Sequence, residues 1–364
     1  MWIPKDTVDE PLHVVTCISN SVRYKSRYKL YRDFQRHMRE AGAILHTVEA
    51  AFGERNFALE EHAHYDNAVE DEKEWKSAGP PNVPRKGQGT YTQVRLDHLQ
   101  EIWLKENFLN YGVQRLPPDW KYVAFVDADV HFARPDIVSE TLHALQHYHV
   151  VQMFSDAIDL YPDYSPQPIV QQKSHAWCHI HGKLNEHVTK QNKGGNDSYG
   201  AGITTPVSAK VSVDDGKMYR HPGFAWAWRR EAFKAVGGLM EHVLLGSADW
   251  HMAWALLGRV DETISRGLSD PYKRICKIWE RRAVEHIKYN IGYVPGTVMH
   301  NWHGKKSDRG YATRWQIMVQ NNYDPDYDLK RDEQGILRLT DTKPKLRDDC
   351  RAYFRRRNED SIDV

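Results

Sequence analysis

The chain has 364 residues, of which 40% are hydrophobic and 27% are charged, and its formal net charge is +1. This composition is typical of a globular protein and argues against a disordered or membrane-embedded chain. A net charge so near zero gives no overall field for attracting nucleic acid or an anionic membrane, so such a partner would need a local basic patch.

The ends and cysteines of the chain suggest a location in the cell. Cys17, Cys178, Cys276 and Cys350 are widely separated and include no C-x-x-C pair, so they suggest neither a disulfide framework nor a zinc ribbon. The first six residues lack a signal peptide's cationic start and apolar stretch, and no apolar run approaches the ~18 residues of a membrane span. We therefore expect a soluble, cytoplasmic protein.

The first elements along the chain alternate between strand and helix. Residues 12–18 form an apolar run that predicts a strand, and the spacing of Tyr28, Tyr31, Phe34 and Met38 predicts a helix. Residues 43–48 predict a second strand. A strand–helix–strand order is the usual start of a parallel α/β sheet.

The remaining elements are interrupted by two long polar stretches. Residues 53–89 predict an irregular excursion, residues 96–108 a helix, 122–126 a strand, 136–147 a helix and 149–154 a strand. Residues 155–217 are rich in Pro, His, Asn and Gly and predict a long loop. Helical patterns return at 230–236, 248–257 and 271–288, and residues 292–298 predict a late strand.

Two carboxylates follow the apolar strand at 122–126. The continuous apolar run is typical of a central strand covered on both faces. Asp127 and Asp129 come directly after it, at the strand end where α/β sheets bind ligands, and carboxylates there can hold a divalent ion. A solvated strand end would explain the same residues. A phosphatase with Asp127 as nucleophile is disfavoured, because such enzymes carry this strand near the domain start.

Three segments, taken in order, resemble motifs of metal-dependent glycosyltransferases of the GT-A fold, especially the β-1,4-galactosyltransferase-like and family 2-like group. The first is residues 103–112, ending in Leu-Asn-Tyr-Gly, followed by 122–129; the second is 223–233, followed by Gly237-Gly238 and 246–249; the third is 299–303. The resemblance covers about residues 12–305. It departs from the family after the glycines, where this chain has one acid, Asp249, instead of an acidic run.

The resemblance implies a fold and a domain plan. The fold would be α/β and Rossmann-like, with a mostly parallel central sheet flanked by helices, a long lid or insert, and a helical C-terminal extension. One domain would span residues 1–340, with a nucleotide-sugar-binding half at about 12–135 and an acceptor and catalytic half at 136–305. Residues 341–364 would form a charged tail.

The resemblance also implies a metal centre holding Mn²⁺ or Mg²⁺. Asp129 would be a ligand, and Asp127 would face the donor ribose or reach the metal through water. His300 and His303 follow the late strand, and imidazole suits Mn²⁺ better than Mg²⁺. We favour His303 over His300, although a chain with 20 histidines also places two close together by chance.

Asp249 is the candidate general base. It opens an apolar helix just after Gly246, so it would accept the proton of an acceptor hydroxyl that attacks the anomeric carbon, and in-line attack would invert that carbon. Helix capping would explain the same residue.

Other positions are assigned to the two substrates. Candidates for donor binding are Ser19, Asn20, Arg23, Arg27, Asn107, Asp127, Ala128 and Lys305; Lys306 and Arg309 could also clamp a diphosphate, although a solvated charged face explains such residues equally well. Candidates for acceptor binding are Gly223, Trp226, Trp228 and Trp250, although most tryptophans in such patterns belong to a core. The glycines at 194–195 and 200–202 suggest a lid over the donor. A zinc site at His175, Cys178, His179 and His181 is disfavoured.

These features together predict an enzyme that moves a sugar from a nucleotide-diphosphate donor, expected to be a UDP-sugar, to an acceptor hydroxyl. A glycan is the expected acceptor. A hydroxymethylated DNA base is the alternative, because residues 273–282 and 343–357 are basic. A non-catalytic sugar-nucleotide-binding protein and a D-x-D phosphatase remain the other readings, and the sequence does not indicate an oligomeric state.

Overall fold

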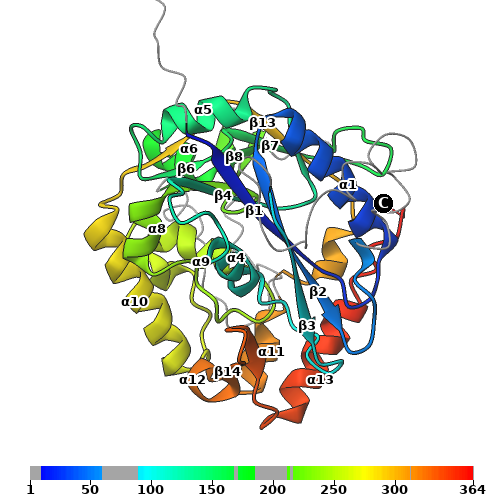
Figure 1. Cartoon of the computed structure of the whole chain (residues 1–364). Coiled ribbons are helices and arrows are strands. Elements are labelled where there is room, and N and C mark those ends of the chain that lie inside the picture. The colour runs from blue at the N-terminus through cyan, green and yellow to red at the C-terminus, as the bar shows by residue number, and fades with distance from the viewer. Residues whose placement is uncertain are drawn as a thin grey trace, which may run out of the picture.

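A seven-stranded sheet forms the centre of the molecule (Figure 1). The computed structural model describes residues 10–59, 89–167, 171–184, 211–213, 216–311 and 313–363. The strand order is β12–β6–β11–β4–β1–β2–β3, with β1 at Leu12–Ser19, β2 at Ile44–Phe52, β3 at Tyr91–Leu96, β4 at Tyr122–Val126, β6 at Val150–Gln152, β11 at Ala225–Arg229 and β12 at Ile291–Tyr293. Only β11 runs antiparallel to its neighbours. This arrangement confirms the expected α/β class with a mostly parallel central sheet.

Helices cover both faces of this sheet. On one face Val15, Val123 and Phe125 share a core cluster with residues of α4 (Lys105–Val113), α8 (Arg230–Val236), α9 (Ala248–Ala255) and α10 (Asp270–His286). On the other face Val14 and Ala124 pack with α1 (Lys25–Glu40) and α5 (Ile137–Ala144). Because successive side chains of a strand point to opposite faces, burial on both sides requires the continuous apolar run of β4.

A second, six-stranded sheet carries part of the candidate site. Its order is β5–β13–β7–β8–β10–β9, with β5 at Val130–Phe132, β7 at Asp156–Asp159, β8 at Gln171–Ser174, β9 at Val211–Val213, β10 at Gly216–His221 and β13 at Thr297–His300. The remaining elements are α6 (His175–Ile180), α11 (Trp315–Gln320), α12 (Pro325–Asp328), α13 (Pro344–Arg355), the 3₁₀ turns at Val260–Glu262 and Lys306–Arg309, and the hairpin of β14 (Leu329–Arg331) and β15 (Leu337–Leu339).

Two expected elements differ from the structure. The helix predicted at 96–108 is wrong in its first half, because Leu96 ends β3 opposite Phe52 and the helix begins only at Lys105. The single strand predicted at 292–298 is two strands in two sheets. The chain leaves the central sheet after β12 and enters the second sheet at β13, passing Gly296 with a φ of +148°.

The stretch expected to be one long loop, residues 155–217, also contains regular structure. Its described part forms β7, β8, α6 and β9, and it contributes to the second sheet. The proposed lid glycines at 194–195 and 200–202 lie outside the described residues, as do residues 60–88 of the first polar excursion.

The described part of the segment expected to be a charged tail, residues 341–363, packs onto the domain. Helix α13 buries Leu346, Cys350 and Tyr353 in the largest core cluster. Figure 1 shows the chain end beside α1. In the described part of the chain, no helix is both long and apolar enough to cross a membrane.

Candidate functional site

A cavity of about 880 Å³ opens where β1 and β4 end. Ile18 at the end of β1 and Val126 and Asp127 at the end of β4 line it, together with residues of the second sheet and of the C-terminal region. The carboxyl edge of a parallel sheet is the usual ligand position in α/β proteins, and this volume lies in the range of small-molecule sites.

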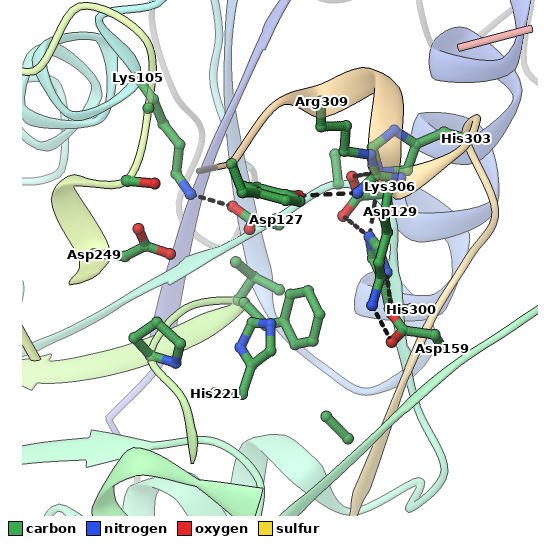
Figure 2. A pocket seen from close by; sticks show the side chains of 18 of the residues that line it. Lys105, Asp127, Asp129, Asp159, His221, Asp249, His300, His303, Lys306 and Arg309 are labelled. Atoms are coloured by element: carbon green, nitrogen blue, oxygen red, sulfur yellow. Dashed lines mark hydrogen bonds and ion pairs between the residues drawn. The ribbon is translucent and has the colours of Figure 1, made fainter. Parts of the chain in front are cut away.

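Asp127 and Asp129 leave the end of β4 in different directions. Asp127 forms an ion pair with Lys105 of α4, whose Nζ lies 2.5 Å from Oδ1. Burial raises the pKa of Asp127, and the Lys105 ammonium opposes this change. In Figure 2, Asp127, Lys105 and Asp249 occupy one side of the cavity, while Asp129 lies on the other side with two histidines.

Asp129, His300 and His303 form a compact cluster. Their ligand atoms all lie within 4.8 Å of one another; Asp129 Oδ2 is 3.0 Å from His303 Nε2, and the two Nε2 atoms are 3.2 Å apart. Strand register brings them together, because β13 pairs with β5 so that His300 lies opposite Val130, the residue after Asp129. Among the described residues, no other His, Cys, Asp or Glu group meets this spacing.

Burial and hydrogen bonding orient the donor atoms of this cluster. His300 Nδ1 lies 2.8 Å from Asp159 Oδ1, so its Nε2 is the ring nitrogen that faces the cluster. Burial, aided by Arg309, lowers the pKa of His303 to about 3. Burial opposes ionisation of Asp129, but His303, His300 and Arg27 outweigh it and hold its pKa well below the ordinary value.

These donors fit a divalent metal ion. Asp129 Oδ1 is buried and has no hydrogen-bond partner among the described residues. A buried anionic oxygen without a partner is costly, and one carboxylate with two imidazoles is a ligand set typical of Mn²⁺, Zn²⁺ and related ions. The chemistry of the three side chains therefore matches a metal centre better than a hydrogen-bonded core cluster.

Cationic side chains surround this cluster. Arg27 and Lys306 line the cavity and are paired with Glu359 and Asp159, respectively. Arg309 and Arg314 also line it and are almost fully buried, but no carboxylate of the described residues lies within ion-pair distance of either. Their guanidinium groups instead contact Tyr311, at 3.1 Å from its hydroxyl for Arg309 and 4.9 Å from its ring centroid for Arg314.

Asp249 lies across the cavity on the second residue of α9. Its Oδ1 accepts the backbone N–H of Trp250 at 2.9 Å, but the N-cap position of α9 belongs to Ser247, which makes no side-chain cap hydrogen bond. Its Oδ2 faces Gly223, where a Cβ atom would lie only 2.1 Å away. The preceding Ser247 has a φ of +76°, a conformation rare for residues other than glycine and frequent at functional sites.

Several predicted site residues lie together in the cavity wall. These are Arg27, Asp127, Ala128, Asp129, Asp249, Trp250, His300 and His303. Gly223 does not line this cavity, but it backs the Asp249 carboxylate.

Other predicted donor-binding residues do not line the main cavity. Asn107 is buried, accepting from the Leu337 amide at 2.9 Å and donating to Glu241 at 3.2 Å. The Asn20 side chain closes a turn onto Tyr24. Ser19 and Asn20 line a separate small recess, and Arg23 and Lys305 do not line the main cavity.

Two of the predicted acceptor tryptophans are also placed differently. Trp228 is 2% exposed and packs in the main core, because strand β11 points it toward α8 and α10. The Trp226 indole N–H donates to the Pro222 carbonyl at 2.7 Å, and this side chain faces a small recess behind Asp249. Of the three predicted acceptor tryptophans, Trp250 alone lines the main cavity, where it is joined by Trp103 and Trp315.

Sequence reasoning missed Lys105, Asp159, Arg314, Arg357 and Glu359. Asp159 lies in a segment expected to be a loop, although it is in register with His300 in the β7–β13 pair. Glu359 lies in a segment expected to be a tail. No local pattern distinguishes either residue from an ordinary surface acid.

Comparisons with known proteins add little to this picture. No protein-family model matches the chain, and no curated protein matches it. Among solved structures, a 4-diphosphocytidyl-2C-methyl-D-erythritol synthase from Anaerococcus prevotii is 10% identical over 79% of this chain and 89% of its own, with a TM-score of 0.29. A protein assigned as a nucleotide-diphospho-sugar transferase from Desulfovibrio desulfuricans is 11% identical over 95% and 97%, with a TM-score of 0.31.

A nucleoside-diphosphate-sugar pyrophosphorylase from Vibrio cholerae is 11% identical over 79% of this chain and 94% of its own, with a TM-score of 0.28. Likenesses at this level carry no argument about activity. The fold and the cavity define an α/β protein with a large cavity at the carboxyl edge of its sheet.

Proposed function

We propose that this chain is a metal-dependent glycosyltransferase that moves a sugar from a nucleoside-diphosphate donor, with UDP as the expected nucleotide, to an acceptor hydroxyl. The observation that carries this proposal is the division of one cavity into two chemical halves. Asp129, His300 and His303 form a metal-type donor set on one side, and Asp249 offers a carboxylate on the other.

The metal half would receive the diphosphate. Asp129, His300 and His303 would hold the ion, which would neutralise negative charge on the departing diphosphate. Arg309 and Arg314 support this assignment, because both guanidinium groups are buried in the cavity wall and hydrogen-bond only to carbonyl and hydroxyl oxygens of the described residues, so their positive charge favours an anionic ligand. The resemblance of 122–129 and 299–303 to GT-A motifs supports the same assignment.

Asp249 would act as the general base in the other half. The acceptor oxygen bonds to the anomeric carbon as the bond between this carbon and the diphosphate oxygen breaks. The acceptor proton passes to Asp249, and the bonding electron pair leaves with the diphosphate. Attack from the side opposite the leaving group inverts the anomeric carbon. Lys105, held by Asp127, adds positive charge near Asp249.

A saccharide acceptor is favoured over DNA. Of the basic residues on α10, Lys273, Arg274 and Lys277 each pair with an acid. On α13, Arg351 and Arg355 both approach Glu101. Ion pairing of this kind reduces the free positive charge that a DNA backbone would need.

The test is product analysis with a panel of nucleoside-diphosphate sugars, with added Mn²⁺ and with a chelator. We expect Mn²⁺-dependent release of nucleoside diphosphate, lost in Asp129→Asn and retained in Asp119→Asn, the same change at an exposed aspartate. Release of pyrophosphate would instead indicate nucleotidyl transfer, and release of inorganic phosphate without a sugar donor would indicate a phosphatase. Either product as the main one would contradict the proposal.

A further inference from the structure

The last residues of the chain are bound to the site rather than left free. Residues 356–363 follow α13 and run between α1 and the turn after His303. Asp360 accepts the backbone N–H groups of Lys25 and Ser26, at 3.0 and 2.8 Å. The indole of Trp302, which lies between the two histidines in sequence, donates to the Ser361 carbonyl at 2.7 Å. We call residues 356–363 the C-terminal strap.

Gly304 permits the close approach of this strap to the histidines. It has a φ of +87°, and a Cβ atom there would lie 2.8 Å from the Asn358 carbonyl oxygen and 3.0 Å from Glu359 Cα. The backbone of the strap therefore packs directly on the residue that follows His303. A side chain at this position would have to push the strap away, because backbone atoms cannot rotate aside.

Glu359 is the strap residue that faces the metal-type cluster. It is 2% exposed, it forms an ion pair with Arg27 of α1 at 2.7 Å, and it forms another with Arg357 at 2.7 Å. Its Oε2 lies 3.8 Å from Nδ1 of His303. That separation is longer than a hydrogen bond, so the interaction is electrostatic. His303 Nδ1 has no hydrogen-bond partner among the described residues.

Each histidine therefore has a carboxylate beside its Nδ1, at hydrogen-bond distance for His300 and at 3.8 Å for His303. Asp159 lies next to Nδ1 of His300, the ring nitrogen that faces away from the cluster. Glu359 lies on the corresponding side of His303, next to its Nδ1. A carboxylate in this place favours the tautomer that is protonated on the near nitrogen, which leaves the far nitrogen free to bind a metal.

We propose that Glu359 is a positioning residue for metal binding, and that the C-terminal strap is thereby an integral part of the site. Glu359 keeps the proton of His303 on Nδ1, so that the Nε2 lone pair points at Asp129 and His300. Arg27 and Arg357 fix the carboxylate in this position. The inference rests on the proposed function in one respect only, namely that Asp129, His300 and His303 bind a metal ion.

The test measures Mn²⁺ affinity directly, by the loss of the free-ion signal in electron paramagnetic resonance, on full-length folded protein. Removing an outer-shell partner of a metal-binding histidine typically costs 10–100-fold in affinity, so we expect Glu359→Gln to weaken Mn²⁺ binding by about that factor. Gly304→Ala should also weaken Mn²⁺ binding, because the added methyl group displaces the C-terminal strap while Glu359 itself is unchanged. Glu333→Gln, the same change at an exposed glutamate, should have no effect.

The outcomes separate this inference from the function on which it rests. If the wild type binds Mn²⁺ and His303→Ala does not, while Glu359→Gln binds as tightly as the wild type with only a lower melting temperature, Glu359 is merely structural and the inference is overturned. The proposed function would then stand. If the wild type binds no Mn²⁺, the metal centre and the inference are overturned together.

Discussion

Substitution of Gly223 by alanine is expected to reduce turnover strongly while leaving the fold nearly intact. The added Cβ would lie 2.1 Å from Asp249 Oδ2, whereas ordinary van der Waals contact begins at 3.4 Å. The carboxylate must therefore retreat by about 1 Å, a misplacement that can cost about 10²-fold in rate. Because the clashing atom is the free end of a side chain, the backbone has no need to move.

The assay compares the turnover number at saturating substrates with the melting temperature. Asp249→Asn should lose about 10²- to 10⁴-fold in turnover, and adding Gly223→Ala to it should cost little more, because the displaced group is already inactive. Gly42→Ala is the matched control. Gly42 does not line the cavity, and no atom lies within 4 Å of its added Cβ. Because its φ is +85°, this substitution should lower stability by about 1–2 kcal/mol without changing turnover.

Two results would refute this reasoning. Near wild-type turnover in Gly223→Ala would show that the position of the Asp249 carboxylate is unimportant. A large fall in melting temperature with this substitution would show that Gly223 is needed for the fold and not for the placement of the base.

Three further predictions concern charge, packing and pH. Arg309→Gln and Arg314→Gln should each raise the KM for the donor by about tenfold, since a charge-assisted hydrogen bond contributes ~1.5–3 kcal/mol. Arg36→Gln, the same change at an exposed arginine, should leave the KM unchanged. An unchanged KM in the first two variants would show that neither residue contacts the diphosphate. Trp228→Ala should lower the free energy of unfolding in urea by about 3–5 kcal/mol, because the side chain is buried in the core; a loss within experimental error would contradict that burial. Glu106 is buried, and burial raises its pKa from 4.5 to about 8. Between these pH values the folded state retains a proton that the unfolded state releases. The free energy of unfolding therefore falls as the pH rises through this range. Glu106→Gln should therefore gain melting temperature relative to the wild type as the pH rises from about 5 to about 9, and a difference independent of pH would refute the shift.

Part of the fold follows from periodicity in the sequence. The apolar runs of β1 and β4 and the helical spacing of α1 predicted their elements, because both faces of the sheet and one face of the helix are buried. The helix predicted at 96–108 was wrong before Lys105, because Leu96 ends β3 and Ile102 is buried from an irregular connection, so the spacing of Leu96, Leu99 and Ile102 resembles a helical face. Burial of an irregular segment leaves no periodic signature of its own.

The candidate site was predictable only where a motif carried it. Asp129, His300 and His303 lie in segments that resemble a family pattern. The position of Asp159 beside His300, by contrast, depends on the register of β7 with β13. The position of Glu359 beside His303 depends on the path of the chain end. One local signal of that path exists: α1 follows Tyr24 with no capping side chain and no acid in its first turn, so its amides need a distant acceptor, which Asp360 supplies.

The most direct test of a metal-dependent active site is anomalous X-ray diffraction from crystals soaked in Mn²⁺, with data collected at the manganese absorption edge. The account predicts an anomalous peak bounded by Asp129, His300 Nε2 and His303 Nε2, and no peak there in His303→Ala crystals. Mn²⁺ bound only elsewhere in the wild type, with this position lacking any peak, would contradict it.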